Sequence, residues 1–396
     1  MNASPNSTVS DPWVRPDPSP ISIIVPTFRE AANIPHLAAR VAGMFRTSGL
    51  SGELLILDDD SRDGTDEVVD ALGLPWVRLI VRTRNRGLSP AVIDGLRAAR
   101  FDRLVVMDAD LSHPPEKIPE MLAELDAGAD FVIGSRYVAG GTTDAEWGLF
   151  RQLNSRVATL LARPFTTAAD PMAGFFALRA DTFRRGEAGL NPIGYKIGLE
   201  LLVKCGCRDV REVPIHFADR IFGDSKLSMA EQLKYVRHLG RLAEFRYPAA
   251  VQLAKFSAVG AVGTVVNLAV LTALTLAGVS VEFAVAAAVL VSLAGNFELN
   301  RRFTFPEARG GSVLGQFAAF AATCSLGAAV NYVTNVALLW LSPGLYPQAA
   351  ALVGIAAGMI FNFVGCRTVA FRPATVEPAV GPTAPAEAKP AAVTER

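Results

Sequence analysis

Four long apolar segments in the last third of the chain restrict its architecture more than any other feature. They cover residues 251–277, 281–299, 314–341 and 346–366. Each is close to the roughly 20 residues that a helix needs to cross a bilayer, and the second and fourth are the shortest. The pattern predicts a membrane domain of four helices over residues 249–372.

Cations flank these segments on one side only. They precede the first segment and follow the second and the fourth, whereas loops 278–281 and 342–348 contain none. Because cytoplasmic loops carry an excess of Lys and Arg, we expect both ends of the membrane domain to be cytoplasmic. We therefore expect a multi-pass protein of the cell (plasma) membrane whose preceding domain faces the cytoplasm. The cations are Lys226, Lys234, Arg237, Arg241, Arg246, Lys255, Arg301, Arg302, Arg309, Arg367 and Arg372.

The membrane segments repeat a polar pattern, which favours two helical hairpins of the same orientation. The repeat consists of Asn296-Phe297 with Asn362-Phe363, and of Gly263 and Asn267 with Gly327 and Asn331. Asparagine is costly to desolvate inside a bilayer, so its side chain faces protein or water. We favour hydrogen bonding between helices as the reason for these residues. A path for a lipid headgroup is the alternative.

Residues 228–248 predict a basic amphipathic helix ahead of the first membrane segment. Apolar side chains recur at helical spacing from Met229 to Phe245, and Lys and Arg fill many of the other positions. Such a helix can lie in the headgroup region of a bilayer. Because the chain next enters the membrane, we favour this interfacial placement over a surface helix packed on the preceding domain.

Residues 21–220 alternate short apolar runs with helical patterns. The runs cover 21–25, 54–57, 77–81, 104–107 and 130–133, and the helical patterns cover 30–47, 65–72, 89–100 and 115–127. Apolar strands separated by helices predict an α/β domain, with a mostly parallel sheet covered on both faces. Ligands of such sheets bind beyond the carboxyl ends of the strands.

Asp108-Ala109-Asp110 directly follows the fourth apolar run. Two carboxylates one residue apart at the end of a buried strand can bracket a divalent cation, which can in turn hold a nucleotide diphosphate. The alternative is a helix N-terminus capped by Asp110 or Ser112. Since capping and metal binding can coexist, Asp108 and Asp110 are candidate ligands of Mg²⁺ or Mn²⁺.

Further polar residues follow other strands of the predicted sheet. Asp58-Asp59-Asp60-Ser61 lies at a strand-to-helix turn, where one carboxylate can accept hydrogen bonds from a nucleobase and the alternative is a solvated cap. Arg136 suits a phosphate because its planar fork binds two oxygens at once. Arg220 and Lys226 can hold an anionic lipid headgroup, and their alternative is the general attraction of juxtamembrane cations to anionic lipids.

Together these stretches resemble family 2 glycosyltransferases. The motifs are Pro26-Thr27-Phe28-Arg29-Glu30, Asp58-Asp59, Met107-Asp108-Ala109-Asp110-Leu111-Ser112-His113-Pro114-Pro115-Glu116, Gly134-Ser135-Arg136-Tyr137, and Asp219-Arg220 with Gly223-Asp224-Ser225-Lys226-Leu227. The most similar subgroup is the polyprenol-phosphate sugar synthases, which are dolichol-phosphate mannose synthase-like. Residues 251–372 resemble the GtrA-like membrane domain.

The chain departs from this family pattern in several places. Arg29 and Asp60 stand where Asn is usual, and Ser112 stands where Gln often follows the metal motif. The sequence contains no Gln-x-x-Arg-Trp motif, which argues against a processive polysaccharide synthase.

The resemblance implies a GT-A, Rossmann-like catalytic domain over residues 21–227. Its expected reaction is transfer of a hexose from a nucleotide sugar to a polyprenyl (dolichyl-type) phosphate, with inversion at the anomeric carbon. GDP-mannose is the favoured donor, and UDP-glucose or another UDP-sugar is the alternative. A glycolipid flippase and a simple membrane anchor are the two alternative roles of the membrane domain.

The resemblance also implies a role for particular residues. These are Pro26, Thr27, Glu30, Asp58, Asp59, Asp108 and Ala109 for the nucleotide sugar, Asp108 and Asp110 for Mg²⁺ or Mn²⁺, Asp110 and Arg136 for catalysis, and Arg136, Ser155, Arg220 and Lys226 for the lipid phosphate.

Composition limits the remaining partners. Basic and acidic residues are equal in number, 38 of each, which gives no support for nucleic-acid binding. The four cysteines have neither metal-site spacing nor a disulfide framework, which fits a reducing compartment. We expect the polar ends, residues 1–20 and 373–396, to be disordered, and residues 1–20 to be no signal peptide. A homo-oligomer stays open.

Overall fold

The computed structural model describes residues 19–144, 149–218, 229–342 and 344–372. The two expected disordered ends therefore lie almost wholly outside the described residues. The chain divides into two compact units, Met1–Arg246 and Tyr247–Arg396.

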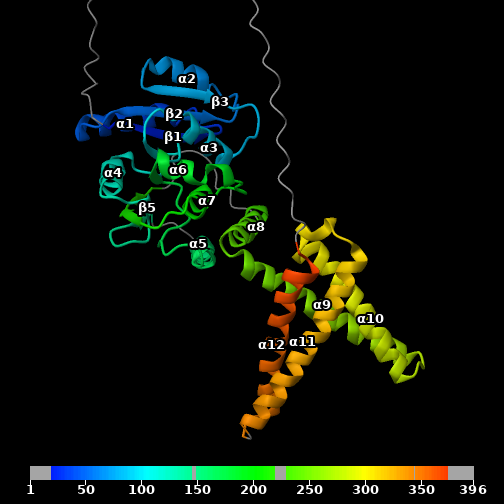
Figure 1. Ribbon diagram of the computed structural model, residues 1–396. Coiled ribbons are helices and arrows are strands. Elements are labelled where there is room, and N and C mark those ends of the chain that lie inside the picture. The colour runs from blue at the N-terminus through cyan, green and yellow to red at the C-terminus, as the bar shows by residue number, and fades with distance from the viewer. Residues whose placement is uncertain (1–18, 145–148, 219–228, 343, 373–396) are drawn as a thin grey trace, which may run out of the picture. The chain divides into compact units, whose positions relative to one another are not determined.

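Within the described part of the first unit, seven strands form one sheet in the order β3-β2-β1-β4-β7-β5-β8 (Figure 1). The strands are β1 (Ile21–Thr27), β2 (Gly52–Asp58), β3 (Val77–Val81), β4 (Arg103–Val106), β5 (Phe131–Ser135), β7 (Phe176–Arg179) and β8 (Val210–Pro214). Only β7 runs antiparallel to its neighbours among these strands. The predicted α/β fold with a mostly parallel sheet is confirmed.

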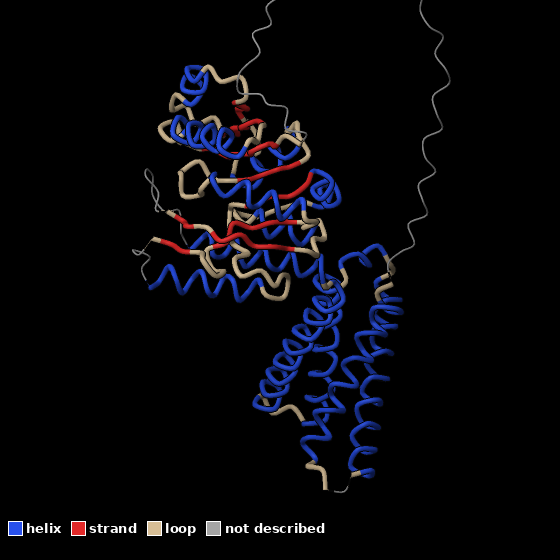
Figure 2. The backbone as a smooth tube through the Cα atoms, turned by 90° about the vertical axis from the view of Figure 1, so that its left-hand side faces the viewer, coloured by secondary structure: helices blue, strands red, loops and turns tan. Residues whose placement is uncertain are grey.

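Successive residues of each strand supply opposite faces of the sheet. Ile23 belongs to the core on one face, whereas its neighbour Ile24 belongs to the core on the other. Because side chains alternate along a strand, a run in which every residue is apolar is stable only when both faces are covered. In Figure 2 helices lie on both sides of the strands.

Two groups of helices provide this cover. Helices α1 and α4 pack on the first face, and α3, α6 and α7 pack on the second. The helices of this unit are α1 (Ile34–Ser48), α2 (Thr65–Leu72), α3 (Leu88–Ala98), α4 (Ile118–Asp126), α5 (Leu149–Ala162), α6 (Ala180–Gly186), α7 (Ile197–Lys204) and α8 (Met229–Arg246). Single 3₁₀ turns, η1 (Pro115–Lys117) and η2 (Glu187–Gly189), precede α4 and follow α6. A separate small sheet pairs β6 (Thr142–Thr143) with β9 (His216–Phe217).

Helix α8 corresponds to the expected amphipathic helix, and part of it packs on the rest of the first unit. Leu242 and His238 are almost fully buried, and the Tyr235 hydroxyl donates to the carbonyl oxygen of Ala158 at 2.7 Å. Leu233 and Val236 are more than half exposed. One side of α8 therefore packs on the rest of the unit, while apolar side chains on other positions are exposed. The interfacial placement of α8 stays a prediction.

The second unit contains four helices that are long and apolar enough to cross a membrane, counted over its described residues. They are α9 (Pro248–Leu276), α10 (Val281–Leu299), α11 (Val313–Leu341) and α12 (Pro347–Gly365). A turn of π-helix extends α10 as η3 (Asn300–Thr304) and α12 as η5 (Cys366–Ala370), and the 3₁₀ turn η4 (Pro306–Gly310) follows η3. The second and fourth spans therefore end at Thr304 and Ala370, beyond the apolar segments 281–299 and 346–366. The apolar segments stop earlier because the last turns contain polar residues such as Asn300 and Arg367.

Asparagine–glycine contacts hold the helices of each hairpin together. A β-carbon on Gly263 would lie 2.1 Å from Oδ1 of Asn296, and one on Gly327 would lie 1.9 Å from Oδ1 of Asn362. Neither Oδ1 atom has a conventional hydrogen-bond partner among the described residues. The expected hydrogen bonds between helices are therefore replaced at these two oxygens by close packing on the glycine backbone, where weak Cα–H···O contacts can form.

We predict that Gly263→Ala destabilises the membrane unit, because the new methyl group and the Asn296 side chain cannot occupy the same space. Overpacking of this kind costs about 1–3 kcal/mol. Thermal unfolding of the full chain in detergent measures the effect. Gly260→Ala is the matched control, since a β-carbon there meets no atom within 4 Å. Equal melting temperatures for the two variants would contradict the proposed packing.

Candidate active site

The loops that follow β1 to β5 meet at one edge of the sheet. β1, β2, β3 and β4 run parallel to one another, and both β4 and β5 run antiparallel to β7. All five strands therefore end at the same edge. The described candidate residues outside α5 all lie at this edge. They are Pro26 and Thr27 at the end of β1, Glu30 after β1, Asp58 at the end of β2, Asp59 after β2, Asp108, Ala109 and Asp110 after β4, and Arg136 after β5.

Backbone strain is concentrated at this edge. The described non-glycine residues with positive φ are Arg29 after β1, Asp60 and Arg62 after β2, Asn85 after β3 and Leu111 after β4. A side chain in this left-handed region costs about 1–2 kcal/mol, and such residues cluster at functional sites. The strain independently identifies the edge as a candidate site.

The Asp58 carboxylate holds the loops after β1 and β2 together. Its Oδ1 accepts hydrogen bonds from Thr27 Oγ1 at 3.1 Å and from Ser61 Oγ at 2.5 Å. Its Oδ2 accepts one from the Ser61 backbone N–H at 2.8 Å. Asp58 thus connects the ends of β1 and β2 to the loop at Ser61, and its expected contact with a nucleotide stays a prediction.

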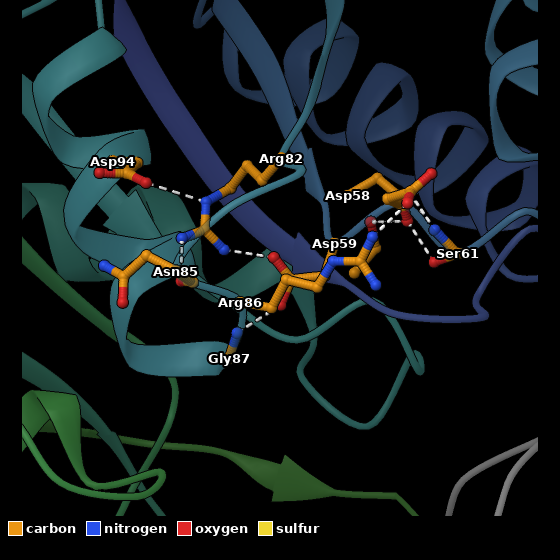
Figure 3. Close-up of polar contacts among 10 residues, drawn as sticks. Asp58, Asp59, Ser61, Arg82, Asn85, Arg86, Gly87 and Asp94 are labelled. Atoms are coloured by element: carbon orange, nitrogen blue, oxygen red, sulfur yellow. Dashed lines mark hydrogen bonds and ion pairs between the residues drawn. The ribbon is translucent and has the colours of Figure 1, made fainter.

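Asp59 forms a second network with the buried Arg82 (Figure 3). The Arg82 guanidinium also donates to Asp94 Oδ2 at 2.9 Å and to the carbonyl oxygen of Asn85 at 2.7 Å. The backbone N–H of Gly87, which precedes α3, donates to Asp59 Oδ2 at 2.6 Å. These contacts fix the start of α3 beside the end of β2. No sequence motif marks Arg82, so its role is evident only from these contacts.

Asp110 forms a tight turn with Ser112. Its Oδ1 accepts hydrogen bonds from Ser112 Oγ at 2.6 Å and from the Ser112 backbone N–H at 3.2 Å. Neither side chain caps the helical turn that begins at Pro115. The capping alternative is therefore not observed, and Ser112 orients the Asp110 carboxylate instead.

His113 fixes the backbone of Asp108 through a hydrogen bond. The Asp108 N–H donates to His113 Nδ1 at 3.0 Å, so the ring proton lies on Nε2. The imidazole is buried and stacks on Phe175, with ring centroids 5.3 Å apart. The Asp108 side chain is 31% exposed. This arrangement presents one carboxylate of the pair to the site.

The space in front of the Asp108 carboxylate is open, as a bound divalent cation would require. A β-carbon on Gly174 would lie 3.4 Å from Asp108 Oδ2 and 3.5 Å from Oδ1, so the glycine leaves space in front of both oxygens. Carboxylate oxygens are the ligands that Mg²⁺ and Mn²⁺ prefer. Within the described residues no group of three or more His, Cys, Asp or Glu could hold a metal ion. A cation at Asp108 and Asp110 would therefore take its remaining ligands from substrate and water.

Arg136 is bound in the site by the fully buried Asp170. Its Nε and Nη2 donate to the two carboxylate oxygens at 2.7 and 2.8 Å, and its backbone N–H adds a bond of 3.1 Å. Burial acts to lower the pKa of Arg136, but the hydrogen bonds and charge of Asp170 outweigh it and raise the pKa. The guanidinium also lies over the rings of Tyr137 and Phe217, each at 5.2 Å. Arg136 is thus a rigidly held cation.

Lys196 joins this group although no sequence motif marks it. Its Nζ donates to the carbonyl oxygen of Met172 at 3.5 Å. Burial lowers the pKa of Lys196, the charge of Arg136 lowers it further, and Asp170 and Asp108 oppose both effects. The sequence provides only a weak signal for Asp170 and Lys196. Asp170 is a charged residue near the apolar strand β7, and Lys196 is a charged residue directly before the apolar helix α7.

The expected lipid-phosphate residues are only partly described. Ser155, on α5, shares a hydrogen bond of 2.7 Å with the Tyr137 hydroxyl and so lies beside the Arg136 loop. Arg220 and Lys226 lie outside the described residues. Ala218, the last described residue before them, donates from its backbone N–H to the carbonyl oxygen of Ser112 at 3.3 Å.

Both units match known protein families. Residues 22–186 match the model described as glycosyl transferase family 2, and residues 255–371 match the GtrA/DPMS transmembrane domain. The four apolar helices and the second match make the chain a multi-pass membrane protein.

The chain is also similar to curated proteins along most of its length. A dolichol-phosphate mannosyltransferase of Pyrococcus furiosus is 39% identical over 340 residues, which cover 85% of this chain and 94% of the relative. A protein of the same name from Mycosarcoma maydis is 43% identical over 246 residues, or 60% and 84% of the two chains.

Solved structures resemble the chain more distantly. A crystal structure of glucosyl-3-phosphoglycerate synthase from Mycobacterium tuberculosis has 20% identity and a TM-score of 0.44, and the match covers 58% of this chain and 78% of that chain.

We predict that Gly174→Val weakens Mn²⁺ binding by about tenfold or more, because the added carbons occupy the space in front of the Asp108 carboxylate. Losses of 10- to 100-fold are typical when the surroundings of metal ligands change. Titration of Mn²⁺ followed by electron paramagnetic resonance measures the affinity. Gly189→Val is the control, since no atom lies within 4 Å of its β-carbon position. Unchanged Mn²⁺ affinity in Gly174→Val would remove Asp108 as a ligand.

Proposed function

Because this chain belongs to glycosyl transferase family 2 and is a glycosyltransferase, we propose that it transfers mannose from GDP-mannose to a polyprenyl phosphate. The relatives named dolichol-phosphate mannosyltransferase support this choice of sugar and acceptor. We further propose that the reaction depends on Mg²⁺ or Mn²⁺, inverts the anomeric carbon and takes place on the cytoplasmic face of the plasma membrane.

The observation that carries the proposal is that two carboxylates and an ion-paired arginine lie at the same edge of the sheet. Asp108 and Asp110 follow β4, and Arg136 follows β5. Gly174, which borders the Asp108 oxygens, is four residues from Asp170, the partner of Arg136. The proposed reaction brings together two anions, the acceptor phosphate and the donor diphosphate. A site for this reaction needs a positive charge beside each of the two anions. A cation held by Asp108 and Asp110 would supply one, and Arg136 would supply the other.

On the donor side, the chain fixes the loops around the nucleotide sugar and provides ligands for the cation. The Asp58 and Asp59 networks hold the loops after β1 and β2 and the start of α3 in one conformation. A divalent cation held by Asp108 and Asp110 would stabilise the charge on the leaving diphosphate. Positioning both substrates in line then lowers the barrier further.

On the acceptor side, no general base is required. A phosphate monoester is already anionic at neutral pH, so its oxygen can attack without losing a proton. Arg136 is positively charged at neutral pH, as arginine always is, and Asp170 raises its pKa further. It can offset the negative charge of the acceptor as the phosphate approaches the donor.

For the membrane unit we propose that it anchors the enzyme beside its lipid substrate. The cations that flank its spans on one side support a cytoplasmic position for the catalytic unit. Movement of the glycolipid across the bilayer is the alternative role.

We predict that Asp110→Asn lowers mannose transfer by more than about a hundredfold, because loss of a charged group that stabilises the transition state has effects of this size. Transfer of radiolabel from GDP-mannose into butanol-extractable lipid measures the activity, with chelation by EDTA as a parallel test. Asp181→Asn is the control, since its side chain is 84% exposed and pairs only with Arg184 among the described contacts. Wild-type activity of folded Asp110→Asn would exclude the metal role.

The same assay tests the donor. We expect label from GDP-mannose to enter the lipid fraction and label from UDP-glucose to remain in the aqueous phase, because the curated relatives are named for mannose. The reverse distribution would replace GDP-mannose by a UDP-sugar. Transfer from neither donor would remove the proposed reaction.

We also predict that Arg220→Ala raises the KM for polyprenyl phosphate much more than the KM for GDP-mannose, because its expected contact is with the lipid phosphate. Initial rates at varied concentrations of each substrate measure both constants. An equal rise in the two constants would argue against binding of the lipid phosphate.

A further inference from the structure

Lys196 lies beside the segment that contains Asp170, the partner of Arg136. The lysine directly precedes α7, and its Nζ donates to the carbonyl oxygen of Met172 at 3.5 Å. A β-carbon on Gly198, in the first turn of α7, would lie 3.2 Å from the carbonyl oxygen of Ala173. The start of α7 therefore packs closely on the segment 170–174, which contains Asp170 and borders Asp108.

Lys196 adds a positive charge beside an ion pair that is already balanced. Asp170 is fully buried, and its two carboxylate oxygens are bound by Arg136. Asp108 and Asp110 would be neutralised by the divalent cation of the proposed function. Lys196 binds the carbonyl oxygen of Met172, two residues from Asp170, and so adds a second cation beside the Arg136–Asp170 pair. A bound anion would balance this added charge.

The surroundings of Lys196 favour the acceptor as that anion. The loop that leads to Lys196 contacts α8, where His238 Nδ1 lies 3.1 Å from the carbonyl oxygen of Ile193. Helix α5, which carries Ser155, contacts α8 through the Tyr235 hydroxyl and Ala158. Lys196 and the expected acceptor residue Ser155 are thus supported by the same helix, and along the chain that helix leads directly into the first membrane span.

We propose that Lys196 binds the phosphate group of the polyprenyl phosphate acceptor together with Arg136. This inference rests on the proposed function and adds a residue to it. A lysine ammonium is a compact point charge, whereas two nitrogens of the Arg136 fork are already bound by Asp170. Lys196 therefore supplies a mobile donor to the phosphate oxygens.

The step that Lys196 supports is balanced without proton transfer. An oxygen of the acceptor phosphate forms a bond to the anomeric carbon of the sugar. The bond from that carbon to the donor's β-phosphate oxygen breaks, and the nucleoside diphosphate leaves with the electron pair. Lys196 holds the attacking phosphate in position throughout.

Binding of a short acceptor tests the proposal separately from turnover. Farnesyl phosphate is titrated into the full chain in detergent, with EDTA present and no donor, by isothermal calorimetry. We expect Lys196→Met to weaken binding by about tenfold or more, since a hydrogen bond to a charged group is lost. We expect Lys196→Arg to restore part of the affinity. The control is Lys117→Met, because Lys117 is a surface residue paired with Glu120.

A parallel titration with GDP and Mn²⁺ separates the two substrates. We expect the affinity of Lys196→Met for GDP to change by less than about threefold, because its proposed contact is with the acceptor alone. A loss confined to GDP would assign Lys196 to the donor and overturn the proposal, as would unchanged binding of farnesyl phosphate. Equal losses for both ligands would indicate a general structural role and overturn it as well.

Failure of this inference is distinguishable from failure of the proposed function. If wild-type protein transfers mannose to lipid but Lys196→Met binds farnesyl phosphate normally, only the role of Lys196 is wrong. If wild-type protein neither binds farnesyl phosphate nor transfers mannose, the proposed function itself is wrong.

Discussion

The active-site edge depends on the buried ion pair between Arg136 and Asp170. Asp170 has no exposed surface and accepts three hydrogen bonds from Arg136. The backbone N–H groups of Ala169 and Asp170 donate to the Glu212 carboxylate at 2.7 and 3.0 Å. These bonds join the end of β5, the segment before β7 and strand β8. Removing one partner of a buried pair costs about 3–5 kcal/mol, so the loop that borders Asp108 takes its position from this interaction.

Much of the sheet was predictable because its strands are continuous apolar runs. The five runs from Ile21 to Ile133 correspond to β1 to β5. β7 and β8 were not predicted, for local reasons: β7 (Phe-Ala-Leu-Arg) has no β-branched residue, and β8 (Val-Arg-Glu-Val-Pro) contains two charged residues. The carboxylate pair after β4 was predictable from position alone. Asp170, Arg82 and Lys196 were not, since each becomes part of the site only through contacts between segments distant in the sequence.

The membrane unit shows the same division between local and tertiary information. Hydropathy predicts four spans, and the structure contains four candidate spans among its described residues. The repeat also singled out Gly263, Asn296, Gly327 and Asn362 before their contacts were known. What the sequence did not indicate is that the asparagine side chains lie against the glycine backbone. Local hydropathy also stops short of Thr304 and Ala370, because the π-helical turns that complete two of the spans contain arginine.

The left-handed residues at the sheet edge have a consequence for the loops that carry them. Glycine at Arg29, Asp60, Arg62, Asn85 or Leu111 would adopt the same backbone angles at no steric cost. It would also let each loop sample many more shapes when no substrate is present, which lowers the stability gained. Side chains at these positions thus exchange some folding free energy for loops that are already arranged before a ligand arrives. Glycine at one of these positions would therefore remove steric strain and loosen the loop at the same time, so we expect it to change activity more than stability.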